Sequence, residues 1–137
     1  RHHILSRWYS NKKVLELKKQ FEIENGFEYD LVMVTRFDCF YHNEWNLSEL
    51  DPKYFYITGG WKGPYESELP DLWFISNSKN MDVLGQLYDK IEETFYYESE
   101  GYWGGHLLIK RYLKMVGLED KTVQYKQHHI DSDILRG

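Results

Sequence analysis

The sequence predicts an α/β fold in which a mixed, mainly parallel sheet is flanked by helices. Two observations predict this fold. Residues 29–35 form a nearly continuous apolar run, which is typical of a strand buried on both faces of a sheet. Further strand-like segments at residues 54–58, 71–76 and 123–127 alternate with segments whose apolar residues recur at helical spacing. This alternation is typical of a sheet covered by helices.

The first predicted helix begins at Ser10 and ends near Asn25, where Gly26 suits a C-terminal cap. Lysine, glutamate and glutamine occupy the other positions of this helix, so it is amphipathic. The strand that follows contains two valines, which favour extended backbone. The side chains that recur at helical spacing are Val14, Leu17, Lys18 and Phe21.

The remaining elements continue the alternation. The strand at residues 54–58 is closed by two glycines, and a loop rich in glycine, proline and acids follows up to residue 70. After the strand at residues 71–76, Ser78 or Asn80 can cap a helix that ends near Phe95. A further helix begins at Gly104 or Gly105 and ends at Gly117, before the short last strand.

Length and composition indicate one folded domain over residues 1–137. The chain has 137 residues and a formal net charge of −5, with 42% hydrophobic and 18% aromatic residues. Such a chain can bury a core of its own and does not resemble a disordered one. We find no internal repeat and no convincing linker, so the helices and strands are expected to share one domain.

Charge and hydropathy limit the partners. The net negative charge and the absence of a long basic run argue against a nucleic-acid partner. No apolar stretch approaches the ~18 residues of a membrane helix, so no membrane span is expected. The single cysteine, Cys39, lies in an apolar run, which suits a free thiol in a reducing cytoplasm.

Arg36 and Asp38 follow directly after the apolar run at residues 29–35. Alternation along a strand places both side chains on one face, at the strand end where open α/β sheets bind ligands. Arginine can offer a two-pronged contact to phosphate, and an aspartate can hold a divalent cation that also touches phosphate oxygens. A structural ion pair between Arg36 and Asp38 is the equally weighted alternative.

Other segments carry candidate binding residues. Trp61 and Tyr65 lie in the glycine-rich loop, where their rings can stack on a sugar or instead cover the core. Asp71 precedes a strand and can orient a bound substrate, or simply be a polar residue at a strand start. His106 can contact phosphate or be an ordinary helix residue. The acids before the last helix, Glu98 and Glu100, also suit a helix N-terminus.

The sequence resembles a group of GT-A-type glycosyltransferases, nucleotide-sugar enzymes of bacterial, phage and viral surface-glycan pathways. In that group an Arg-any-Asp variant of the aspartate-any-aspartate metal motif follows a strand that begins with Tyr-Asp. The matching stretches are residues 7–10, residues 29–38, residues 71–77 with Met81, Leu87 and Tyr88, and the helix after Glu98-Ser99-Glu100. The resemblance covers most of the chain, and its motifs are short.

The resemblance implies roles for several residues. Asp38 takes the position of the last motif aspartate, which binds Mn²⁺ or Mg²⁺ bridging the diphosphate of a sugar nucleotide. Arg36 replaces the first aspartate and cannot ligate a metal, although it can neutralise phosphate directly. His129, after the last predicted strand, is the expected second metal ligand. The alternative for His128 and His129 is that both are exposed in a polar tail. Glu100 is the expected base that deprotonates the acceptor.

These expectations define the functional hypotheses. The first is a glycosyltransferase that moves a sugar from a nucleotide-sugar donor to a glycan acceptor with metal-assisted diphosphate binding. The second is a non-catalytic glycan-binding or interaction module, and the third a degenerate relative kept for assembly with a partner chain.

A complete GT-A domain begins with a βαβ unit that holds the nucleoside base, whereas here only residues 1–10 precede the first predicted helix. We therefore expect a truncated or minimal GT-A fold, corresponding to the C-terminal part of a longer domain. The pattern Asp131-Ser132-Asp133 lies in a polar tail and is not expected to act.

Overall fold

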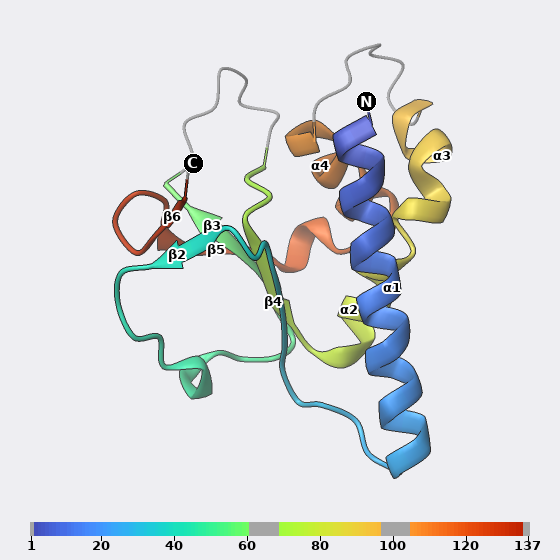
Figure 1. The fold of residues 1–137 in the computed structure, drawn as a ribbon, viewed down its shortest axis with the longest axis horizontal. Helices are drawn as coiled ribbons and strands as arrows, with labels where there is room; N and C mark the ends of the chain where they lie inside the picture. Colours follow the sequence, from blue (N-terminus) through green and yellow to red (C-terminus); the bar gives the residue numbers. More distant parts are fainter. Residues whose placement is uncertain (1, 61–68, 97–104, 136–137) are drawn as a thin grey trace.

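A four-stranded sheet lies at the centre of the protein (Figure 1). The computed structural model describes residues 2–60, 69–96 and 105–135. The strand order in the sheet is β1 (Val32–Thr35), β4 (Trp73–Ser76), β3 (Phe55–Gly59) and β5 (Thr122–Gln127). A smaller sheet pairs β2 (Cys39–Tyr41) with β6 (Ser132–Ile134). The helices are α1 (His2–Asn25), α2 (Ser78–Gly85), α3 (Ile91–Tyr96) and α4 (Gly105–Met115), with 3₁₀ turns η1 (Leu47–Glu49), η2 (Tyr88–Lys90) and η3 (Glu119–Lys121).

The sheet is mixed, as predicted, but the prediction that it is mainly parallel is wrong. Strand β4 pairs antiparallel with both β1 and β3, and only the pairing of β3 with β5 is parallel. The prediction failed because the apolar runs report burial and not direction. Strands β3 and β4 are buried along their whole length in the middle of the sheet, which antiparallel strands also achieve when both faces are covered.

Strand β1 lies at the edge of the sheet, and although its side chains pack against the cores on both faces, most of them are only partly buried. Only Val34 of this strand is buried, whereas Thr35 is exposed. The exposed end of β1 leads into the turn that carries Arg36 and Asp38. This position at an edge leaves the turn open to a ligand.

Alternating side chains of the central strands build a separate core on each face of the sheet. Phe55, Ile57 and Phe74 point to the face covered by the helices, where they pack in one cluster with residues of α1, α2 and α4. Tyr56 and Trp73 point to the opposite face, which is covered by the segment from β2 to η1 and by β6 (Figure 1). The α/β fold with helices beside a mixed sheet is therefore confirmed, with the helical core on one face.

Helix α1 is longer than predicted and turns a different face toward the core. It begins at His2 rather than at Ser10, and it buries Trp8 and Leu15. The predicted apolar face is exposed instead, with Leu17 66% accessible and Val14 and Phe21 about half accessible. Close packing of Leu15 against Gly85 of α2 explains the orientation, because a Cβ at Gly85 would lie 3.2 Å from Leu15 Cβ.

The later elements differ from the prediction in detail. The helix expected up to Phe95 is divided into α2, η2 and α3, and Asn77 is its N-cap, accepting a hydrogen bond from Asn80 N–H at 2.8 Å. The segment after β5, expected as a polar tail, contains strand β6. None of the described helices has the length and apolar character needed to span a membrane.

Candidate functional site

The turn between β1 and β2 carries Arg36 and Asp38. Arg36 N–H donates to Leu72 O at 3.2 Å, and Cys39 N–H closes the turn on Arg36 O, also at 3.2 Å. The side chains then meet through two parallel hydrogen bonds, Nε to Oδ1 at 2.8 Å and Nη2 to Oδ2 at 2.6 Å. Each side chain is about one third exposed. The predicted pair thus exists, and both carboxylate oxygens of Asp38 accept from Arg36.

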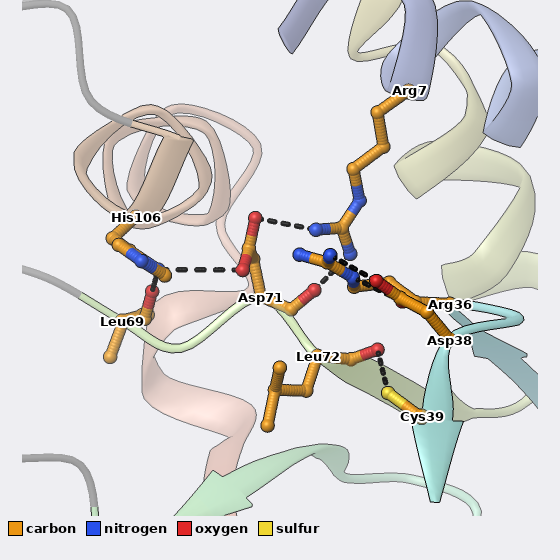
Figure 2. A network of polar contacts seen from close by, with 8 residues as sticks. All are labelled: Arg7, Arg36, Asp38, Cys39, Leu69, Asp71, Leu72 and His106. Atoms are coloured by element: carbon orange, nitrogen blue, oxygen red, sulfur yellow. Dashed lines mark hydrogen bonds and ion pairs between the residues drawn. The ribbon is translucent and has the colours of Figure 1, made fainter. Parts of the chain in front are cut away.

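Asp71 forms the second half of the site, just before β4. Its Oδ2 accepts from Nη1 of Arg7 at 2.5 Å, and its backbone carbonyl accepts from Nη2 of the same guanidinium. On the other side, Nδ1 of His106 lies 3.5 Å from Asp71 Oδ1 and donates to Leu69 O at 3.0 Å (Figure 2). Asp71 therefore connects the N-terminal half of α1 with the first turn of α4.

The guanidinium groups of Arg7 and Arg36 lie close together in this network (Figure 2). Burial lowers the pKa of Arg7, Asp71 raises it, and the positive charge of Arg36 lowers it further, so that the net shift is downward. The hydrogen bonds to Asp38 raise the pKa of Arg36 and hold the pKa of Asp38 below its usual range. Two positive charges therefore face one place, each held by its own carboxylate.

Both arginines line a groove of about 530 Å³ between α1 and the β1–β2 turn. Helix α1 contributes hydroxyl and amide side chains to this groove, and the Nδ2 donor of Asn11 is buried without a hydrogen-bond partner among the described residues. Phe37 stands fully exposed on the turn. Donors and positive charge on one wall suit an anion, and the exposed ring suits a flat or apolar group bound beside it. The polar residues of the lining are His3, Ser6, Arg7, Ser10, Asn11, Thr35, Arg36 and Asp38.

The structure brings together four of the residues that the sequence singled out: Arg36, Asp38, Asp71 and His106. They come from the β1–β2 turn, the start of β4 and the start of α4. Three other predicted residues, Trp61, Tyr65 and Glu100, lie outside the described residues. The stacking role of the two aromatic side chains and the base role of Glu100 therefore stay predictions.

Sequence reasoning missed Arg7, Asn11 and Phe37. Arg7 precedes the expected start of the first helix, so it was not placed on any element that could reach Asp71. A helix beginning at His2 would have been the signal, because it brings Arg7 and Asn11 onto one side of α1, four residues apart. An exposed phenylalanine between two charged residues would have pointed to Phe37.

Each of the two expected metal ligands, Asp38 and His129, has another side-chain partner in the structure. Asp38 is engaged by Arg36, whereas Nδ1 of His129 lies 3.2 Å from Asp133 Oδ2 in the turn between β5 and β6. Within residues 2–60, 69–96 and 105–135, the group of three or more ligand side chains that lie close together is His128, His129 and Asp133. A Mn²⁺ or Mg²⁺ ion at Asp38 would share this carboxylate with Arg36, using the lone pairs that the two hydrogen bonds leave.

Comparison with protein-family models, with curated proteins and with solved structures gives no match to this chain. The geometry of the groove is therefore the basis for assigning a function to this chain.

Proposed function

We propose that this chain binds the diphosphate of a nucleotide-sugar donor in the groove between α1 and the β1–β2 turn, and that it takes part in glycosyl transfer to a glycan acceptor. The observation that carries the proposal is the meeting of Arg7 and Arg36 at one groove. Two guanidinium groups held at fixed positions match the charge and the oxygen pattern of a diphosphate. The resemblance to GT-A-type enzymes in residues 29–38 supports a sugar nucleotide as the source of that diphosphate.

Asp38 and Asp71 fix the orientation of the two arginines but do not use all the hydrogen-bond donors of their guanidinium groups. Asp38 uses Nε and Nη2 of Arg36, which leaves the two hydrogens of Nη1 for a ligand. Asp71 takes Nη1 and Nη2 of Arg7 on the side facing β4. A guanidinium fixed in this way loses little freedom on binding phosphate, so the site is preorganised.

Neutralisation of the diphosphate falls mainly to the two arginines in this proposal, because both oxygens of Asp38 accept from Arg36. The departure of a nucleoside diphosphate in glycosyl transfer needs such positive charge, whether from side chains or from a metal. A Mn²⁺ or Mg²⁺ ion bound at Asp38 would add further positive charge at the diphosphate. The same experiment tests this second part of the proposal.

Thermal unfolding with uridine or guanosine diphosphate tests the proposal. A ligand at a hundredfold excess over its Kd should raise the melting temperature by on the order of 10 °C in a domain of this size. The shift should be largely lost in Arg36→Gln and in Arg7→Gln. Lys53→Gln should keep it, because Lys53 also pairs with an aspartate two residues away, Asp51 at 2.9 Å, but does not line the groove.

Each titration is run with Mn²⁺, with Mg²⁺ and with a chelator. A shift that needs metal in the parent and loses the metal effect in Asp38→Asn supports the metal part of the proposal; a shift that survives chelation assigns the diphosphate to the arginines alone. No shift with any nucleoside diphosphate, or equal shifts in parent and Arg36→Gln, would overturn the proposed function. Saccharide binding that survives both chelation and Arg36→Gln would instead support a glycan-binding module.

A further inference from the structure

The turn after β5 and the adjoining strand β6 gather three potential metal ligands on the face of the sheet away from the helices (Figure 1). One ligand atom each from His128, His129 and Asp133 lies within 4.8 Å of the other two. Nδ1 of His129 is 3.2 Å from Asp133 Oδ2. The turn does not contribute to the arginine groove, so this cluster is separate from the proposed diphosphate site.

Neighbouring residues in extended backbone send their side chains to opposite faces, so two adjacent histidines do not normally share a ligand. Here the backbone departs from that pattern. His129 has φ 66° and Lys126 has φ 53°, both in the left-handed region. The two imidazole rings consequently lie with their centroids 3.7 Å apart and their planes inclined by 33°. Left-handed backbone in residues other than glycine concentrates at functional sites.

Backbone hydrogen bonds hold this turn in one shape. His129 N–H donates to Ser132 O at 2.8 Å, and His128 N–H donates to Gly59 O at 3.0 Å, which ties the turn to β3. The carboxylate of Asp131 is used inside the turn, where its Oδ2 accepts from Gln127 N–H at 2.8 Å. The ligands are therefore presented by a fixed loop, and Asp131 is not among them.

Asp133 is ready to act as an anionic ligand. Its position on β6 is fixed by pairing with Phe40 of β2. Ile134 N–H donates to Oδ1 of Asp133 at 2.8 Å, and Nδ1 of His129 lies 3.2 Å from its Oδ2, so the carboxylate is held facing the imidazole. Two imidazoles near one carboxylate form a nitrogen-rich set with one negative charge.

We infer that His128, His129 and Asp133 bind a divalent first-row transition metal, with Zn²⁺ as the representative ion. Imidazole nitrogen and carboxylate oxygen are the ligands that Zn²⁺ takes at about 2.0–2.2 Å, and the three ligand atoms already lie within 4.8 Å of one another. Mg²⁺ and Ca²⁺ prefer sets made of oxygen alone, so they should bind here poorly. Three protein ligands leave a fourth position of a tetrahedral ion for water. The inference does not depend on the diphosphate proposal.

Titration of the full chain with Zn²⁺ by calorimetry, and with Co²⁺ by visible absorption, tests the site. We expect one ion per chain and the absorption bands of low-coordinate Co²⁺, which Zn²⁺ should displace. His129→Ala and Asp133→Asn should each weaken Zn²⁺ binding by at least about tenfold, the loss that even indirect support of a metal ligand commonly causes. Both side chains are partly exposed, so the variants should fold.

The chain supplies a matched control in its other adjacent histidine pair, His2 and His3. Replacing both of these with alanine should leave the Zn²⁺ affinity and the Co²⁺ spectrum unchanged. The inference is overturned if the parent binds neither metal, if His129→Ala and Asp133→Asn keep the parental affinity, or if the His2 and His3 double variant abolishes the signal. Mg²⁺ competing equally with Zn²⁺ would also contradict it.

Discussion

Asp71 connects two helices to the sheet through one side chain. Its carboxylate accepts from Arg7 of α1 and lies beside His106 of α4, and the Arg7 and Asp71 side chains are only 19% and 13% exposed. Asp71→Ala leaves a largely buried guanidinium with only a backbone carbonyl to bind. We expect it to lower the free energy of unfolding by about 1–3 kcal/mol, measured by urea titration.

Asp89→Ala is the matched control for Asp71→Ala. Asp89 also binds α1, through Lys12 at 2.7 Å, but its side chain is 52% exposed. Exposed pairs of this kind contribute about 0–1 kcal/mol, because water and salt screen them and both side chains lose freedom. Equal losses in the two variants would show that Asp71 does not join the helices as the structure indicates.

Gly59 is a position where the backbones of β3 and β5 approach each other closely. A Cβ built at this position would lie 3.0 Å from the backbone oxygen of Lys126, and the pairing of the two strands shifts between Thr58 and Gly59. Gly59→Ala therefore requires the backbone of β5 at Lys126 to give way by a few tenths of an ångström. We expect the free energy of unfolding to fall by about 1–3 kcal/mol in urea titrations. Parental stability in this variant would contradict the close approach.

The elements themselves were largely predictable from the sequence. Short runs rich in apolar residues identify β3 and β4, which are buried along their whole length, and Gly26 marks the end of α1. These features were predictable because each depends only on residues that are close together in the sequence. Strands β2 and β6 escaped prediction because each has three residues and is held mainly by pairing with the other. The face of α1 escaped for a different reason. Val14 and Leu17 have the right spacing for a core face, but Gly85 makes room for Leu15 instead.

At the scale of the whole molecule, the sequence does not show which strands pair with each other or in which direction they run. The sequence indicated that Arg36 and Asp38 share a strand end, and the structure adds that Asp71 and Arg7 reach the same place. That convergence depends on the antiparallel pairing of β1 with β4, which brings the end of β1 beside the start of β4. Spacing along one strand carries no information about its neighbour, so the place of Asp71 beside Arg36 and Asp38 does not follow from the spacing within residues 29–38.

Acid should destabilise the whole fold, and Glu22 should account for part of the loss. Burial raises the pKa of Glu22, but hydrogen bonds from Ser78, from Tyr29 N–H and from Lys18 outweigh it and hold the pKa below the ordinary 4.5. A carboxyl with a lowered folded-state pKa stabilises the fold above its unfolded pKa, and this stability is lost as pH falls through the folded value. Urea titrations should therefore give a free energy of unfolding that falls below about pH 4.5. In Glu22→Gln the fall should be smaller, so the stability gap between parent and variant should narrow toward pH 3. A gap that stays constant from pH 7 to pH 3 would show that Glu22 is not an ionised, hydrogen-bonded carboxylate in the folded protein.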